Sequence, residues 1–251
     1  MWRHILFRSL FLLIIITGFK PAFAIEFSAK AVQHYPQGKP RIAVISVGDD
    51  GVRREYQLNQ QTIIDIYRPS KQTRWVIYPK QLAYRQYKGV KIKTGMARST
   101  KPISTNPCTE GSNQRCRLLG RENINGRLAD KWEVNRSIKG KIIKALIWVD
   151  VQRGQALRQF FPDGSRVELL QLKDEMINGR KTEKWILKST QPGGKIEQTY
   201  QWYDPQLGII IKESIPGGYV RELRDIKVGK QPAVLFKVPA GYHELKTNKP
   251  K

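Results

Sequence analysis

Short runs of alternating apolar and polar residues dominate this chain, and they are the pattern of half-buried β-strands. In the run from Ile143 to Val149, every odd position is apolar and Lys144 interrupts the even face. Gly48-Asp49-Asp50-Gly51 separates two such runs and predicts a tight hairpin turn. After residue 24, the sequence lacks the period of a long amphipathic helix. We therefore expect strands at 27–34, 41–47, 52–58, 62–67, 74–78, 81–87, 143–149, 166–172, 199–203 and 209–211.

A unit of two Trp-bearing strands and their turns occurs twice in the second half of the chain. The copies lie 53 to 54 positions apart, and a repeat at fixed spacing is a strong guide to architecture. One copy, at roughly 54 residues of strand, is marginal for a core of its own. We therefore predict one large antiparallel sheet that curves into an incomplete, half-open β-barrel over residues 25–245. The matching positions are Asn125 with Asn178, Gly126 with Gly179, Arg127 with Arg180, Trp132 with Trp185, Trp148 with Trp202 and Asp150 with Asp204.

The first 24 residues predict a cleaved secretion signal. Arg3 and Arg8 flank the start of a short apolar run, Leu10 to Ile16, and Ala22-Phe23-Ala24 has the small-x-small form of a cleavage site. The apolar run is shorter than the roughly 20 residues that cross a bilayer. We expect cleavage after Ala24 and a periplasmic location, and a single N-terminal membrane anchor is the alternative.

The chain is strongly basic, with 45 Lys and Arg against 21 Asp and Glu and a net charge of +24. Residues 1–24 contain three cations and no acid, so cleavage would leave 24 − 3 = +21. Such a charge attracts phosphate-rich partners in a salt-dependent way. Behind a secretion signal, anionic lipid head groups, lipopolysaccharide phosphates and cell-wall polymers are favoured over nucleic acid. A merely solubilising surface is an equally weighted alternative.

The cations gather between Asp65 and Glu110, where the sequence has no acidic residue. Residues 88–118 show no strand or helix period and predict a basic loop, and residues 246–251 predict a disordered basic tail. The candidates for contact with an anionic surface or an envelope partner are Lys80, Arg85, Lys88, Lys91, Lys93, Arg98 and Lys101.

Cys108 and Cys116 are the two cysteines of the chain. In an oxidising compartment, an even pair that closes a short loop predicts a disulfide. A loop of this size contributes at most about 2–3 kcal/mol in the chain-entropy model, so we expect a local role. A metal site would need further Cys or His ligands nearby, and the sequence has none there.

The sequence lacks the motifs of the common enzyme classes. It has no HExxH, no Gly-rich phosphate loop followed by Lys-Ser/Thr, and no dinucleotide fingerprint. Asp150 and Asp204 each precede a glycine by four residues, which favours a turn role over that of paired glycosidase acids. We predict a protein that is not an enzyme and has no cofactor or metal. A hydrolase site at His34 or His243 is a weaker alternative, because neither lies in a nucleophile motif.

Trp residues in strands usually pack in a core, but a half-barrel lined with Trp and Ile also suits an acyl chain, since such a cavity needs apolar walls and few polar anchors. The candidates for the walls of a ligand cavity are Ile64, Ile66, Trp75, Ile77, Trp148 and Trp202.

Three phrases of the chain resemble a family of uncharacterised secreted bacterial domains. The first is Ile64 to Pro69 followed by Trp75 to Pro79 and Tyr84, the second is Gly120 to Arg127 followed by Lys131-Trp132, and the third is Pro232 to Tyr242. That family resembles, more distantly, the periplasmic lipoprotein carriers and receptors of the LolA/LolB type. The resemblance covers most of residues 27–243, and its motifs are strand and turn phrases.

The resemblance implies an incomplete β-barrel that encloses an apolar cavity. Carriers of this type usually have helices at the cavity mouth, and this sequence shows no clear ones. We therefore expect a non-enzymatic periplasmic protein that binds a lipid or a lipidated protein, in outer-membrane lipid or lipoprotein handling. The alternative is a basic envelope scaffold that binds an anionic membrane surface or a partner protein and holds no internal ligand.

Overall fold

The structure is a computed structural model that describes residues 25–90, 104–108, 114–138 and 141–245. The predicted secretion signal and the predicted basic tail lie outside these residues. So do four of the predicted surface cations, which are Lys91, Lys93, Arg98 and Lys101.

Within the described residues, seventeen strands make up one sheet. They are β1 (Phe27–His34), β2 (Arg41–Gly48), β3 (Gly51–Leu58), β4 (Gln61–Arg68), β5 (Thr73–Tyr78), β6 (Ala83–Lys88), β7 (Gln114–Ile124), β8 (Arg127–Ile138), β9 (Lys141–Asp150), β10 (Ala156–Phe160), β11 (Arg166–Gln171), β12 (Glu175–Ile177), β13 (Arg180–Thr190), β14 (Ile196–Asp204), β15 (Ile209–Ile215), β16 (Tyr219–Val228) and β17 (His243–Glu244). In the described residues, the helical elements are two short 3-10 turns, η1 (Pro79–Gln81) and η2 (Ala233–Phe236).

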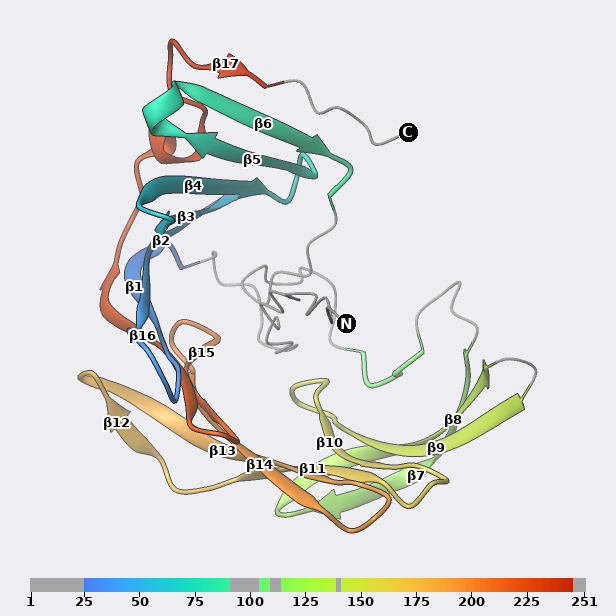
Figure 1. The fold of residues 1–251 in the computed structure, drawn as a ribbon. Coiled ribbons are helices and arrows are strands. Elements are labelled where there is room, and N and C mark those ends of the chain that lie inside the picture. The colour runs from blue at the N-terminus through green and yellow to red at the C-terminus, as the bar shows by residue number, and fades with distance from the viewer. Residues whose placement is uncertain (1–24, 91–103, 109–113, 139–140, 246–251) are drawn as a thin grey trace, which may run out of the picture.

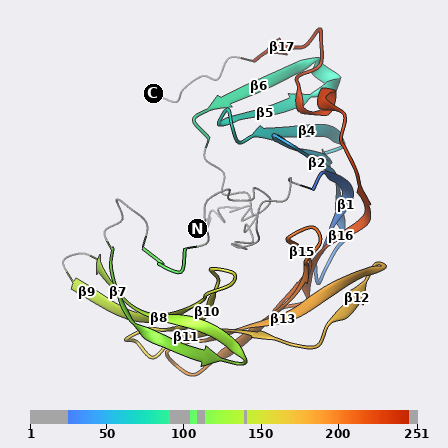
Figure 2. The ribbon, with the colours of Figure 1, turned by 180° about the vertical axis from the view of Figure 1, so that it is seen from behind.

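Neighbouring strands in the sheet are mostly neighbours in the chain. From one edge to the other the order is β7, β8, β9, β10, β11, β13, β14, β15, β16, β1, β2, β3, β4, β5, β6 and β17, while β12 pairs with β13 beyond the end of β11. Only the pairing of β17 with β6 is parallel among the described strands. Figures 1 and 2 show the sheet as an arc, with β6 and β17 at one end and β7 to β9 at the other. The predicted fold class, a mostly β protein with one antiparallel sheet curved into a half-open barrel, is confirmed.

The predicted Asn-Gly turns set the register of two hairpins. Asn125 and Gly126 have φ of +53° and +81°, and Asn178 and Gly179 have φ of +49° and +75°. Two positive φ values in a two-residue loop define a turn whose twist matches that of the flanking strands, and Asn-Gly is the sequence best suited to it. Each turn therefore joins its strands without a register shift next to the loop.

The two copies of the repeat lie side by side in the sheet. Strands β8 to β11 correspond to β13 to β16, and the end of β7 corresponds to β12. The prediction that the copies are consecutive segments of one curved sheet is confirmed, because β11 pairs directly with β13.

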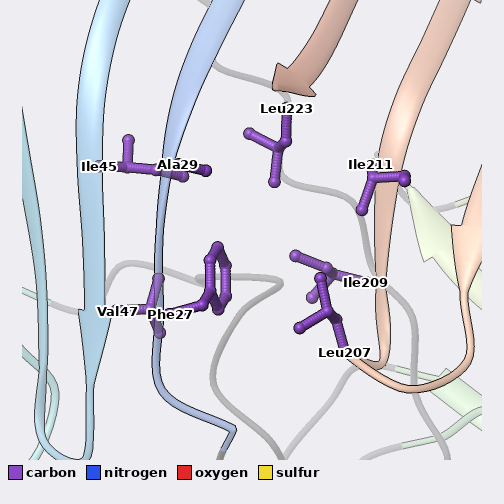
Figure 3. Packing of buried hydrophobic residues seen from close by; sticks show 8 residues of the cluster. All are labelled: Phe27, Ala29, Ile45, Val47, Leu207, Ile209, Ile211 and Leu223. Atoms are coloured by element: carbon purple, nitrogen blue, oxygen red, sulfur yellow. The ribbon is translucent and has the colours of Figure 1, made fainter. Parts of the chain in front are cut away.

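Apolar side chains of the described strands and turns form three clusters. The first lies where β1 and β2 meet β15 and β16 (Figure 3) and consists of Phe27, Ala29, Ile45, Val47, Leu207, Ile209, Ile211 and Leu223. The second joins the two copies of the repeat and contains Ile124, Ala129, Trp148, Leu157, Leu169, Trp185, Tyr203 and Ile210. The third lies between β4, β5 and the C-terminal segment and is built around Ile66, Ile77 and Phe236.

The structure differs from the sequence-based expectation at β7. This strand begins at Gln114, so residues 114–118 of the predicted loop pair with Arg136 to Trp132 of β8. Most side chains of β7 are exposed, because the strand lies at the edge of the sheet and has one partner strand. An edge strand of this kind lacks the alternation that reveals half-buried strands. Within the described ranges, no helix has the length and apolarity needed to cross a membrane.

Candidate ligand-binding surface

Four of the predicted cavity residues share one face of the sheet. Ile64 lies opposite Ile77, and Ile66 lies opposite Trp75, on the neighbouring strands β4 and β5. Side chains directly opposite each other on paired strands point to the same face. These four pack against Leu235, Phe236, Val238 and Tyr242 of the C-terminal segment. In both overall views this segment runs along the outer side of the arc (Figures 1 and 2).

The ring of Phe236 anchors the C-terminal segment in a socket made by two glycines. A Cβ at Gly48 would lie 2.5 Å from the ring, and a Cβ at Gly51 would lie 2.6 Å from it. Both distances are too short for real carbon atoms, so the ring occupies space that exists because these residues have no side chain. Ile66 and Ile77, beneath the same segment, are 1% and 0% exposed. Of the four predicted wall residues, Ile66 and Ile77 are thus buried by the protein's own chain, and Ile64 and Trp75 are partly buried beside them.

Trp148 and Trp202, the other two predicted cavity residues, lie apart from these four and have matching surroundings. The indole Nε1 of Trp148 donates to Oε2 of Glu122 at 2.7 Å, and Lys131 donates to Oε1 of the same carboxylate at 2.8 Å. The Lys131 ammonium also lies 5.0 Å from the centre of the Trp148 ring. The lysine hydrogen bond, followed by that of the indole, lowers the pKa of Glu122.

The second copy of the repeat reproduces this arrangement. Trp202 donates to Glu175 at 2.7 Å and Lys184 donates to it at 2.6 Å, and these bonds lower the pKa of Glu175. Both Trp rings are buried. Because each indole N–H is bonded and each ring carries a cation on its face, the two Trp residues serve as packed structural elements of the sheet.

Asp150 and Asp204 organise the turns that follow β9 and β14. Oδ1 of Asp150 accepts hydrogen bonds from the backbone N–H groups of Gln152 and Arg153, and its Oδ2 accepts one from Arg127. Asp204 does the same with Gln206, Leu207 and Arg180. The predicted turn role of these two carboxylates is confirmed.

The turn after β9 lies over a small pocket next to the second cluster. Arg153, Gln155, Trp185, Gln201, Tyr203 and Ile210 line this pocket. Arg153 forms a two-bond pair with Glu183, with N–O distances of 2.6 and 2.8 Å. Its guanidinium also lies 5.5 Å from the Trp185 ring centre and 5.7 Å from that of Tyr203. The sequence did not predict this polar site. Leu207 stands at the position of Arg153 in the second copy, so comparison of the two copies does not draw attention to the arginine.

A second unpredicted site lies around Asp65, at the centre of β4. Its side chain is 3% exposed and accepts hydrogen bonds from Arg54 at 2.6 Å and from Arg74 at 2.9 and 2.8 Å. Alternation along β4 places Asp65 on the face opposite Ile64 and Ile66. The stretch without acids that follows Asp65 contains Arg74 and is the sequence feature that points to this site. Arg54 precedes that stretch, so the sequence gives no indication that it contacts Asp65.

The predicted surface cations that fall in described residues lie on different sides of the sheet. Lys80 is in η1. Arg85 lies opposite Val76, on the face of Asp65, whereas Lys88 lies opposite Thr73, on the face of Trp75. All three are exposed. Alternation along β6 therefore separates Arg85 from Lys88 despite their proximity in sequence.

The histidines do not assemble a hydrolase site in the described residues. His34 lies 3.4 Å from Glu222 and 3.4 Å from Arg224, two residues that pair with each other. His243 is exposed on the two-residue strand β17. The part of the chain that the structure describes contains no group of three His, Cys, Asp or Glu side chains that could hold a metal ion.

The predicted disulfide between Cys108 and Cys116 is confirmed, with a Cα–Cα distance of 5.9 Å. Cys116 lies in β7, so the bridge ties the segment before that edge strand to the strand itself. A disulfide is typical of proteins folded in an oxidising compartment and is consistent with an envelope location.

Comparison with known proteins gives structural matches only. No protein-family model matches the sequence, and no curated protein matches it. The fold is similar to a LolA superfamily protein from Nitrosomonas europaea, with 13% identity, 87% of this chain and 92% of that chain covered, and a TM-score of 0.37. It is also similar to a putative outer membrane lipoprotein-sorting protein domain from Vibrio parahaemolyticus, with 12% identity, 87% and 94% covered, and a TM-score of 0.31. A DUF1329 family protein from Desulfovibrio piger matches with 13% identity, 86% and 90% covered, and a TM-score of 0.25.

Proposed function

We propose that this protein is a non-enzymatic periplasmic protein that binds a lipid or a lipidated protein on the inner side of its half-open barrel. The observation that carries the proposal is the arrangement of the sheet. It is one continuous arc (Figure 1) whose end strands, β7 and β17, do not pair with each other in the described residues. The inner side of this arc is the face on which we place the ligand.

The two faces of the N-terminal half of the sheet support the inner side as the ligand surface. The face of Ile64 and Trp75 is occupied by the C-terminal segment. The opposite face carries Ala31 and Val52, which are partly buried at the border of the first cluster, with the charged residues around Asp65 beside them. Apolar area next to a few fixed polar groups is the usual composition of a site for an amphipathic ligand. Ile64, Ile66, Trp75 and Ile77 would line a cavity only if the C-terminal segment moved away.

The carboxylates that would have to act in an enzyme have structural partners. Asp150 and Asp204 cap turns, Glu122 and Glu175 hold indole and lysine groups, and Glu183 pairs with Arg153. A general acid or base must reach a substrate proton, and hydrogen-bonded pairs of this kind are poorly placed for that task. The structural roles of these carboxylates therefore favour a binding function over catalysis.

Binding of an anionic envelope surface or a partner protein, without an internal ligand, is the second candidate. It is favoured by the exposed Lys80 in η1 and the exposed Arg85 and Lys88 in β6, two elements that carry no acid. Surface binding of this type weakens steeply with salt, whereas apolar binding largely survives it.

Mass spectrometry of lipids extracted from natively purified protein tests the first candidate. We expect a lipid or acylated peptide in near-stoichiometric amount, retained at high salt, and absent from empty resin treated with the same lysate. Lipid-free protein that also fails to take up a fluorescent fatty-acyl probe would contradict the proposal. Binding to anionic vesicles that disappears at high salt would instead support the second candidate.

A further inference from the structure

A row of charged side chains crosses four strands on the face that the C-terminal segment leaves uncovered. Arg54 on β3 lies opposite Asp65 on β4, Asp65 lies opposite Val76 on β5, and Val76 lies opposite Arg85 on β6. Arg74, two residues before Val76, shares this face. Two guanidinium groups and one carboxylate are in direct contact here, and a third guanidinium is nearby in the same row.

The row carries more positive charge than the buried carboxylate requires. Asp65 would be neutralised by one arginine, yet it binds both Arg54 and Arg74. With Arg85, the formal charge of these four side chains is +3 − 1 = +2. The nearest acid of β3, Glu55, points to the other face and binds Arg53. Arg54 and Arg74 are 29% and 35% exposed, so both guanidinium groups reach the surface.

Tyrosines on the same face add aromatic area and hydroxyl donors. Tyr87 lies opposite Arg74, with the guanidinium 5.9 Å from its ring centre. Tyr56 follows Arg54 by two residues, so it has the same orientation. Burial, and then the charge of Asp65, raise the pKa of Tyr56. Its hydroxyl therefore stays protonated at neutral pH and can donate to an anion.

The charged row borders apolar side chains. Val52, two residues before Arg54 on the same face of β3, is partly buried and packs against the first cluster (Figure 3), of which Ile45, opposite Arg54 on β2, is a buried member. Arginine binds phosphate oxygens through two parallel N–H groups and is less strongly hydrated than lysine. A ligand that suits both parts of this face has a phosphate group joined to an apolar tail.

We propose that Arg54, Arg74 and Arg85 form the binding site for the phosphate of an anionic phospholipid head group. The inference deepens the proposed function, on which it rests, by naming the chemistry of the ligand. Asp65 holds Arg54 and Arg74 in place, Arg85 supplies a further charge, and the tyrosines flank the head group. The acyl chains extend toward the first cluster.

Calorimetric titration of the chain that begins at Ile25 tests this proposal with soluble short-chain lipids. Dihexanoylphosphatidylglycerol is the probe, and dihexanoylglycerol, with the same chains and no phosphate, is the neutral comparison. We expect Arg74→Gln and Arg85→Gln each to weaken binding of the phospholipid by about tenfold and to leave the neutral lipid unaffected. Arg85 forms no ion pair with a described residue, so its variant should fold like the parent even if Arg74→Gln does not.

Lys88→Gln is the matched control, since it removes one exposed cation from the same strand on the other face. It should change the affinity by less than about twofold. Phospholipid binding that survives both arginine substitutions would overturn the proposal and leave the proposed function standing. Inorganic phosphate that binds as tightly as the phospholipid would overturn it in favour of a free anion. Failure of both lipids to bind would also overturn the proposal, and the lipid extraction described above then decides the proposed function.

Discussion

Phe236 fills the space that a side chain at Gly48 would need, since a Cβ there would lie 2.5 Å from the ring. Replacement of Phe236 by Ala should therefore lower the free energy of unfolding by about 3 kcal/mol, because it removes a buried ring and leaves a cavity. Gly48→Ala should lower it by about 1–3 kcal/mol through overpacking. Urea-induced unfolding followed by circular dichroism measures both changes.

Val234→Ala is the control for this segment, because Val234 is 71% exposed in the same 3-10 turn. Its effect should stay within about 0.5 kcal/mol. If Phe236→Ala were as stable as Val234→Ala, the C-terminal segment would not be anchored by the glycine socket.

The turn carboxylates Asp150 and Asp204 should be essential for stability to a similar degree. Replacement of either by Ala removes two bonds to backbone N–H groups and leaves its arginine without the partner carboxylate. We expect a loss of about 3 kcal/mol for each variant in thermal or urea unfolding. Asp174→Ala is the comparison, since Asp174 is exposed and lies 3.5 Å from Lys181. Equal stability of all three variants would contradict the role of the turns.

Acid should weaken the contact between Glu183 and Arg153. Burial alone would raise the pKa of Glu183, but the hydrogen bonds and charge of Arg153 outweigh it, and the pKa lies below its usual value. The folded state therefore holds the proton less tightly than the unfolded state. The stabilisation is present above the unfolded pKa of about 4.3 and is lost as the pH falls below it.

A comparison of the parent with Glu183→Gln over this pH range measures the effect. At pH 7 the variant should be less stable by about 1 kcal/mol or more, and the difference should shrink as the pH falls through the lowered pKa of Glu183. Glu197→Gln, which removes an exposed partner of Lys195, should have little effect at either pH. A difference that grew on acidification would contradict this assignment.

The disulfide between Cys108 and Cys116 should have a modest, local effect. Replacement of both residues by Ser should lower the free energy of unfolding by at most about 2–3 kcal/mol, as expected for a short loop. Unfolding with and without dithiothreitol checks this, since reductant should destabilise the parent and leave the double variant unchanged. Loss of the whole fold on reduction would mean that the bridge stabilises more than the start of β7.

Much of the fold follows from local patterns in the sequence. Asn125-Gly126 and Asn178-Gly179 specify their turns through backbone conformation, so the hairpins and the pairing of the repeats could be predicted. Strand β7 was missed because Leu118 and Leu119 lie exposed among charged residues at an edge, where burial imposes no alternation. Local patterns of this kind therefore identify paired, half-buried strands best.

The candidate site is harder to predict because it depends on which face of the sheet is covered. Alternation shows that Ile64 and Asp65 point to opposite faces, but the face that lies under the C-terminal segment is set by Phe236, some 170 positions later. The contact of Arg54 with Asp65 likewise depends on cross-strand register. Sequence patterns therefore found the apolar residues of β4 and β5 and missed the charged row behind them.

The central place of β1 has a consequence for synthesis. This strand pairs with β2 on one side and with β16 on the other, where Phe27 lies opposite Val228. During synthesis the β1–β2 hairpin can form early. The other edge of β1 stays unpaired until β16, some 200 residues later in the sequence, has been made. Contacts of such sequence separation make folding slow and leave an open strand edge exposed to aggregation in the meantime. A chaperone that shields strand edges during folding would therefore act most usefully on β1.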